Sequence, residues 1–289
     1  MRKWTKIILN KSNKISKEKK VKNFEDFCKE DDAKHDFGDG SYKTNKYYKN
    51  KETFFQFYLK ERYKILDEYL ERNLNSKEKI LSISSGRAIN ELKFIEKKHN
   101  IVCSDLDIPE CYDSSKRIVG DFRYLKFDIL KDKLNQKYDC IISLSAMYLF
   151  SNVELEKVLK NLKQTLNDRG KLILEFSGPE DNYTAFFFHE IYLYFESLFA
   201  YFFSKIFRLQ LGLEFDKSFT HLNKNYEIIN IAEKIGFKFE SYEEHDNLTE
   251  LKRSILIKKI FKYFPKSKKF FNIIGKKLPY IRLFKFTKI

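Results

Sequence analysis

The chain has 289 residues, 43% of them hydrophobic, which is enough for one substantial core and excludes a disordered protein. The net charge is +15, but nine Lys or Arg and one acid fall in residues 1–23, and thirteen with no acid fall in residues 251–289. Residues 24–250 therefore have a net charge of −6, which excludes a uniformly basic domain.

The four cysteines, Cys28, Cys103, Cys111 and Cys140, have no spacing typical of a zinc site or a disulfide framework. Cys103 and Cys140 fall inside apolar runs typical of buried strands. The apolar run near the amino terminus is too short for a secretory signal. We therefore expect a reducing, cytoplasmic location and no metal site.

The chain divides into a polar, lysine-rich arm over residues 1–50 and a folded domain over residues 51–289. The arm lacks apolar periodicity, which is typical of a disordered or loosely docked segment. From Phe54 through Leu70, apolar residues recur every three or four positions. This spacing predicts an amphipathic helix that leads into the first strand.

Short apolar runs and amphipathic segments alternate through the next hundred or so residues. A helix with Ile89, Leu92 and Ile95 on one face is predicted between the first two strands. The predicted strands are 79–84, 101–105, 123–128, 138–145 and 171–177. Strands that alternate with helices form a parallel sheet covered on both faces.

The helix before the fifth strand has the clearest signals in the chain. Ser151 and Glu154 form a capping box at its start, and Gly170 is suited to its C-cap. Its apolar stripe consists of Val153, Leu155, Val158, Leu159, Leu162 and Leu166.

Residues 183–214 are predicted to form an aromatic helical insertion after the fifth strand. Ten of the eighteen residues from Phe186 to Phe203 are aromatic, and two glutamates, Glu190 and Glu196, lie among them. A charge at the centre of a bilayer costs about 2.5–3.5 kcal/mol. We therefore expect an amphipathic helix rather than a membrane-spanning one.

The alternation resumes with a helix at 226–235, closed by Gly236, and a strand at 237–243. Two basic amphipathic helices are predicted within 249–278, separated by Pro265. The terminal run PYIRLFKFTKI has a strand-like composition. It is expected to add the last strand to the same sheet.

Small and acidic residues follow the predicted strands, where a doubly wound sheet binds its ligand. The turn at 84–86 lets the backbone approach a ligand after the first strand. Asp105 ends the second strand nineteen residues after Gly86, a distance typical of a carboxylate that binds ribose hydroxyls. Asp128 ends the third strand, and residues 144–147 form the loop after the fourth.

With these features in this order, residues 54–245 resemble the class I S-adenosylmethionine-dependent methyltransferases. The resemblance implies an α/β fold, a doubly wound seven-stranded Rossmann-like sheet. An amino-terminal helical extension precedes the sheet, and helical insertions follow strands five and six. The resemblance also implies S-adenosylmethionine as the cofactor and methyl transfer as the reaction.

The resemblance assigns the cofactor to residues near the ends of the first four strands. The turn at 84–86 would hold the methionine end, Asp105 the ribose and Asp128 the adenine amino group, while Leu106 packs on the adenine. The implied cofactor-binding residues are Ser82, Ser84, Ser85, Gly86, Asp105, Leu106, Asp128, Ser143 and Ser145.

The chain departs from the family pattern in the first strand and turn. An acid followed by three glycines appears here as Ser82, Ser84, Gly86 and Ala88. Each replacement is small, so the backbone can still approach a ligand, but the acid expected at Ser82 is missing. Asp107 competes for the role of Asp105, and Asp128 has the alternative role of capping a short helix.

Methyl transfer from a sulfonium to a hydroxyl needs in-line alignment and a base with a pKa close to neutral. Histidine supplies such a base, and His189 and His221 are the candidate catalytic residues. Solvated or structural roles remain open for both, as they do for Glu190 and His245. No NPPY-like motif follows the fourth strand, so methylation of an adenine or a glutamine amide is not indicated.

The expected acceptor is a small molecule, a glycan or a lipid-linked compound. In residues 251–278, Lys and Arg interleave with Leu, Ile and Phe, as in helices that lie on an anionic membrane. This pattern predicts a peripheral position on the inner face of a membrane. Nucleic acid is less favoured because no recognisable module is present. The alternatives are an RNA methyltransferase and a non-catalytic methyltransferase-like binding protein with an eroded cofactor motif.

Overall fold

A computed structural model describes the chain over most of its length. The described residues are 3–11, 54–86, 88–109, 112–144, 146–178, 182–206, 213–221, 223–246, 251, 254–275 and 277–289. The strands of the main sheet are β2 (Lys79–Ile83), β3 (Asn100–Asp105), β4 (Arg123–Lys126), β5 (Tyr138–Ser143), β6 (Leu166–Ser177), β8 (Phe237–Asp246) and β9 (Pro279–Lys288).

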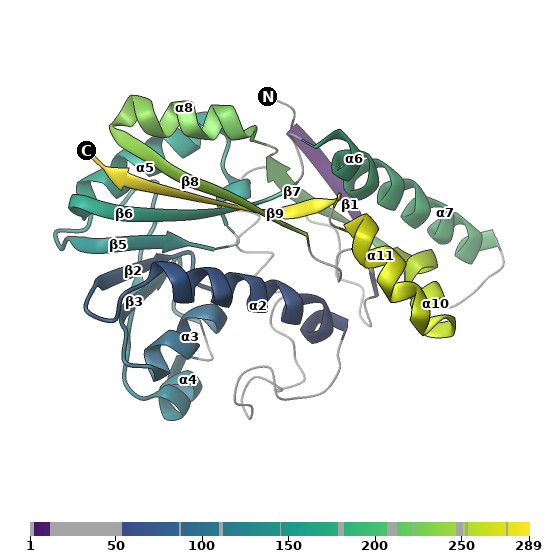
Figure 1. The fold of residues 1–289 in the computed structure, drawn as a ribbon, viewed down its shortest axis with the longest axis horizontal. Coiled ribbons are helices and arrows are strands. Elements are labelled where there is room, and N and C mark those ends of the chain that lie inside the picture. The colour runs from purple at the N-terminus through teal and green to yellow at the C-terminus, as the bar shows by residue number, and fades with distance from the viewer. Residues whose placement is uncertain are drawn as a thin grey trace.

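The main sheet has the spatial order β4-β3-β2-β5-β6-β9-β8 (Figure 1). Strands β2 to β6 pair in parallel, as the sequence predicted. The last strand, β9, lies between β6 and β8 and runs antiparallel to both. The prediction that the terminal segment joins the same sheet is therefore confirmed, and the sheet is mixed rather than wholly parallel.

Helices cover both faces of the sheet, which confirms the doubly wound prediction (Figure 1). Helices α2 (Phe54–Asn73), α3 (Ile89–Glu96) and α4 (Tyr112–Val119) cover one face, and α5 (Asn152–Thr165) and α8 (Asn225–Ile235) cover the other. Successive residues of a strand point to opposite faces. Ile80 accordingly belongs to the core under α2 and α3, whereas Leu81 and Ile83 belong to the core under α5 and α8.

Helix α5 confirms the predicted start and corrects two details. The Ser151 and Glu154 capping box is present, but the side chain of Val153 is exposed rather than buried. At about 100° per residue, Val153 lies about 200° around the helix from the buried Leu155. The helix ends at Thr165, so Gly170 lies within β6 instead of capping α5, and a Cβ there would come within 2.8 Å of the Asn167 carbonyl oxygen.

The two cysteines within the described residues are free and buried, Cys103 in β3 and Cys140 in β5. The prediction that they belong to buried strands is confirmed. Burial raises the pKa of both thiols, that of Cys140 to about 12, so neither is a reactive thiolate. Cys28 and Cys111 lie outside the described residues.

Two segments that are distant in the sequence form a helical lobe beside the sheet (Figure 1). The lobe consists of α6 (Tyr183–Phe186), the π-helix η3 (Phe187–Tyr192), α7 (Leu193–Ile206), α10 (Ile255–Tyr263), η4 (Pro265–Ser267) and α11 (Lys268–Gly275). Its first segment follows the carboxyl end of β6, and its second precedes the start of β9, where Ile281 pairs with Ser177. The lobe therefore lies beyond the carboxyl ends of the parallel strands. None of the described helices is long and apolar enough to cross a bilayer.

A second, two-stranded sheet was not predicted. Its strands, β1 (Lys3–Lys11) and β7 (Leu213–His221), pair antiparallel. Part of the arm expected to lack regular structure is thus a strand, and β7 begins within the segment expected to be helical. Each strand pairs with a segment about two hundred residues away in the sequence. Such distant pairing leaves no periodic pattern in the sequence of either short strand.

Candidate functional site

The turn after β2 has an open, left-handed backbone. Ser84, Gly86 and Ala88 have φ angles of 53°, 52° and 55°, a region that favours glycine. Gly86 is exposed, and a Cβ placed on it would meet no atom within 4 Å. The serine and alanine therefore hold a glycine-like turn, and the space over Gly86 is open to a ligand.

Asp105, at the carboxyl end of β3, reaches directly to this turn. Its Oδ2 accepts a hydrogen bond of 2.7 Å from the backbone N–H of Gly86, and its Oδ1 accepts one of 2.7 Å from the N–H of Leu106. Asp107, its competitor, is largely exposed and forms an ion pair with Lys126. The structure thus brings Asp105 to the turn, as predicted, and directs Asp107 elsewhere.

Two side chains that the sequence did not single out hold this turn in place. Tyr124, buried on β4, donates a hydrogen bond of 2.7 Å from its hydroxyl to the carbonyl oxygen of Gly86. The N–H of Ser85 donates to the carbonyl oxygen of Ser104 at 2.9 Å, and the hydroxyl of Ser104 donates to the carbonyl oxygen of Ser82 at 2.9 Å. The turn is therefore fixed to β3 and β4, which both lie on one side of β2 in the sheet.

Glu91 lies beside Ser82, the position where the resemblance in sequence implies an acid. The Ser82 hydroxyl donates a hydrogen bond of 2.6 Å to Oε1 of Glu91, and both side chains are buried. Burial raises the pKa of Glu91 to about 7, with smaller contributions from the carboxylates of Asp67 and Asp105. Glu91 lies four residues before Ile95 on the predicted buried face of α3, and this is the only clue to it in the sequence.

The remaining predicted cofactor residues occupy less direct positions. Oδ1 of Asp128 accepts a hydrogen bond of 2.9 Å from the N–H of Leu130, and Oδ2 forms an ion pair of 3.2 Å with Lys131. Asp128 therefore caps a local turn over residues 129–131, whereas the alternative from the sequence was the cap of a short helix. The Ser143 hydroxyl donates to the carbonyl oxygen of Ile83 at 3.2 Å, which joins β5 to β2, and Ser145 lies outside the described residues.

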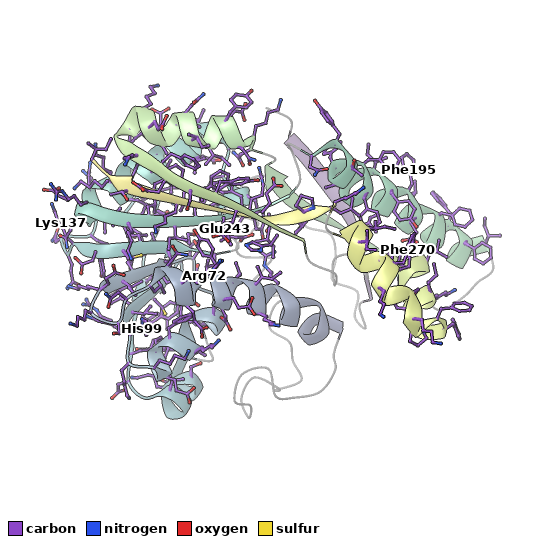
Figure 2. The ribbon with its side chains drawn as sticks, in the orientation of Figure 1. Arg72, His99, Lys137, Phe195, Glu243 and Phe270 are labelled. Carbon is purple, nitrogen blue, oxygen red and sulfur yellow. The ribbon has the colours of Figure 1, made fainter. Side chains whose placement is uncertain are left out.

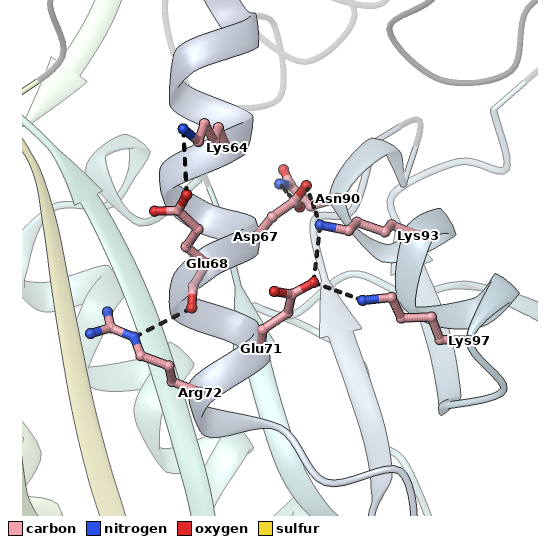
Figure 3. Close-up of polar contacts among 8 residues, drawn as sticks. All are labelled: Lys64, Asp67, Glu68, Glu71, Arg72, Asn90, Lys93 and Lys97. Carbon is pink, nitrogen blue, oxygen red and sulfur yellow. Dashed lines mark hydrogen bonds and ion pairs between the residues drawn. The ribbon is translucent and has the colours of Figure 1, made fainter.

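Charged side chains fix α2 against α3 next to the turn (Figure 3). Asp67 accepts a hydrogen bond of 3.0 Å from Asn90 and pairs with Lys93 at 3.3 Å, while Glu71 pairs with Lys93 at 3.1 Å and Lys97 at 2.7 Å. Lys97 and Lys93 lower the pKa of Glu71, whereas burial raises that of Asp67. The helix before the first strand is therefore tied to the helix after it.

A buried ion pair fixes α2 to the sheet at its carboxyl edge. Nη2 of Arg62 lies 2.7 Å from Oε2 of Glu175 and 2.9 Å from Oγ of Ser177, both on β6. The Ser177 hydroxyl also donates to Oε1 of Glu175 at 3.0 Å. The sequence offered no signal for this pairing, because the partners lie more than a hundred residues apart.

The candidate catalytic histidines lie on elements beyond β6, at the same edge as the turn. His189 belongs to η3 and His221 ends β7, but both side chains lie outside what the structure describes. His245, on β8, lies 3.1 Å from Glu243 through its Nε2. A hollow of about 560 Å³, lined by residues that include Glu71, Asn73, Phe94 and His99, lies at the opposite edge, near the amino ends of β2 and β3.

Comparison with known proteins identifies the fold. No protein-family model matches the chain, and no curated protein sequence is similar to it. Among solved structures, the chain is similar to magnesium protoporphyrin IX methyltransferase from Synechocystis PCC 6803 with bound S-adenosylhomocysteine. The identity is 13%, the match covers 86% of this chain and 92% of that one, and the TM-score is 0.50.

The PH0226 protein from Pyrococcus horikoshii OT3 is similar to the same degree. The identity is again 13%, with 80% of this chain and 91% of that one covered and a TM-score of 0.50. Identities this low establish the fold and not the activity. The chain has the Rossmann-like fold of class I methyltransferases, as its sequence predicted.

Proposed function

We propose that the chain is an S-adenosylmethionine-dependent methyltransferase. The observation that carries this proposal is the contact of Asp105 with the N–H of Gly86, at the crevice where a doubly wound sheet binds nucleotides. A carboxylate at the end of the second strand can accept hydrogen bonds from both ribose hydroxyls. The open backbone at Gly86 suits close approach of the methionine end.

The cofactor supplies an electrophilic methyl group on a sulfonium, and the protein aligns it with the acceptor. In this proposal the turn at 84–86 holds the methionine end, Asp105 the ribose, and Asp128 the adenine amino group, with Leu106 against the adenine. Ser143 ends β5, and Ser145 belongs to the loop after it, which would face the transferred methyl group.

Glu91 completes the methionine end of the proposed site. It contacts Ser82, where the family has its acid, so a carboxylate from α3 takes the place of one from β2. A buried carboxyl with a strongly raised pKa in such a place is typical of functional sites. A cationic ligand nearby would favour its ionised form.

Calorimetry with S-adenosylmethionine and S-adenosylhomocysteine tests the proposal. Wild-type protein should bind both, and Asp105→Asn should weaken binding roughly 10- to 100-fold, because hydrogen bonds to a charged group are lost. Asp107→Asn is the matched control and should bind within about twofold of wild type. If the wild type binds neither compound, the non-catalytic alternative replaces this proposal.

The acceptor is proposed to be a small molecule, a glycan or a lipid-linked compound, methylated by the cytoplasmic protein at the surface of a membrane. For a hydroxyl acceptor, His189 or His221 would accept the proton. Replacement of each by Ala, followed by single-turnover transfer, tests that role. Unchanged rates in both variants would reject both histidines, and transfer to RNA alone would favour the alternative substrate.

A further inference from the structure

The helical lobe has an unusual surface for a folded protein. Sixteen large apolar side chains are exposed among the described residues, and twelve of them belong to the two segments of the lobe. These twelve, the apolar face of the lobe, are Tyr183, Phe187, Phe195, Phe199, Phe202, Phe203, Ile206, Leu256, Tyr263, Phe264, Phe270 and Ile273. Clusters of exposed apolar side chains on this scale mark interaction sites.

These twelve side chains lie outside the lobe's own buried core. The lobe has a separate small core, which includes Ala185, Leu251, Ile257 and Phe261. Glu196 of α7 joins the two segments, because its Oε1 accepts hydrogen bonds from Ser254 Oγ at 2.9 Å and from the N–H of Leu256 at 3.0 Å. The exposed residues therefore remain on the outside of an already packed unit, and Figure 2 shows Phe195 and Phe270 on it.

The second segment of the lobe carries only positively charged side chains beside these apolar residues. Residues 251–278 contain ten Lys or Arg and no Asp or Glu. Lys259, Lys266, Lys269 and Lys277 are exposed, and within the described residues no ion pair involves any of them. The acid of α7, Glu196, is occupied by the contacts between the segments. The surface therefore combines apolar side chains with unneutralised positive charge.

We infer that the apolar face of the lobe and its lysines bind the surface of an anionic lipid bilayer. Aromatic and aliphatic side chains enter the boundary between headgroups and acyl chains, and lysines attract anionic headgroups. A second copy of the chain would bring two lysine-rich surfaces together, and like charges disfavour that contact. A nucleic acid would leave most of the aliphatic side chains without an apolar environment.

A bound bilayer would be the source of the acceptor in the proposed methyl transfer. Only this link to the acceptor rests on the proposed function. The lobe lies at the carboxyl edge of the sheet, the same edge as the turn at 84–86. A bilayer bound to the lobe would therefore present an acceptor from its surface to the methyl-transfer side of the domain. Binding to lipid does not itself require the cofactor.

Vesicle flotation with the full chain tests the inference. Wild-type protein should float with vesicles of phosphatidylcholine and phosphatidylglycerol at 7:3 and not with phosphatidylcholine alone. Each basic residue near an anionic surface contributes roughly a fivefold factor to partitioning. The triple variant K259Q/K266Q/K269Q should therefore lose roughly a hundredfold of binding, and Phe199→Ser combined with Phe270→Ser should also abolish flotation.

Matched controls separate the lobe from general charge and hydrophobicity. K98Q/K133Q/K137Q removes three exposed lysines from the sheet domain, and Val153→Ser removes an exposed apolar side chain there. Both controls should float like wild type, and circular dichroism checks that every variant is folded. Equal losses in the lobe and control variants would overturn the inference.

Two further outcomes also overturn it. In one, wild-type protein does not float with anionic vesicles but forms a dimer that the lobe variants dissociate, so the occupant is a second copy. In the other, only RNA binding depends on the lobe variants. Calorimetry with S-adenosylhomocysteine on the same samples tells a failure of the membrane inference from a failure of the proposed methyltransferase function.

Discussion

The sheet domain and the helical lobe use the same residue types in opposite ways. In the sheet domain, several lysines pair with acids, as Lys93 does with Asp67 and Glu71, and the large aromatic side chains Phe176, Phe284 and Phe286 are buried. In the lobe, four described lysines make no ion pair with any described residue, and twelve large apolar side chains face outward. The sheet domain is complete in itself, whereas the lobe's surface suits a partner.

A large loss of stability is expected when the sheet domain's buried ion pair is broken. Arg62→Ala removes the buried cation that pairs with Glu175, which should lower the free energy of unfolding by roughly 3–5 kcal/mol in urea denaturation. Replacing both partners, with Arg62→Met and Glu175→Gln, should recover most of the loss, because both members of the ion pair are removed together. A loss below about 1 kcal/mol in the single variant would contradict this role.

Replacing Glu91 is expected to stabilise the protein at high pH and to change how its stability depends on pH. Its pKa rises from 4.5 to about 7 on folding, so the folded protein holds a proton that the unfolded chain releases between these values. The contribution of Glu91 to the free energy of unfolding should therefore fall as the pH rises from 4.5 to 7, by about 3 kcal/mol in total, then level off. Glu91→Gln should remove this dependence and be more stable at pH 8.

Two measurements sharpen the result at Glu91. Glu71→Gln is the control, because the pKa of exposed Glu71 is lowered by Lys97 and no gain at pH 8 is expected. If Glu91 also serves the methionine end of the cofactor, Glu91→Gln should bind S-adenosylhomocysteine roughly tenfold more weakly while unfolding at higher urea. Unchanged binding of S-adenosylhomocysteine would show that Glu91 has only a structural role, as the partner of Ser82.

Removing a helix cap should affect global unfolding in the sheet domain but only local opening in the lobe. Ser151→Ala removes the cap of α5 and should lower the global free energy of unfolding by about 1 kcal/mol. Ser254→Ala removes the cap of α10, and its effect should be local, with faster hydrogen exchange in the lobe. Equal effects of both variants on global unfolding would show that the lobe and the sheet unfold as one unit.

The smallest effect is expected on the lobe's outer surface. Phe199→Ala should change the free energy of unfolding by no more than about 0.5 kcal/mol, because the side chain is already exposed. Phe176→Ala, its buried counterpart on β6, should cost roughly 3–5 kcal/mol. A large loss of stability in Phe199→Ala, measured by thermal or urea unfolding, would mean that this face stabilises the fold and is not a free binding surface.

Much of the site could be predicted because it depends on short-range order. The capping box at Ser151, the turn at Gly86 and the end of β3 at Asp105 follow from local spacing, and the fold brings the last two together. Gly170 was misplaced because the helix ends at Thr165, and Val153 was misplaced because it points away from the buried face that Leu155 shares. β1 and β7 were missed because each depends on a partner far away in the chain.

The amino-acid sequence by itself determined the order along the chain of the strands in the main sheet, the doubly wound class and the position of Asp105, since periodicity and turn residues act over a few neighbours. Only the tertiary structure decided that Glu91 lies against Ser82, that Arg62 is buried against Glu175, and that the aromatic and basic insertions form one lobe. Those contacts join residues between nine and more than a hundred positions apart. They exist only when the packed sheet brings these residues together.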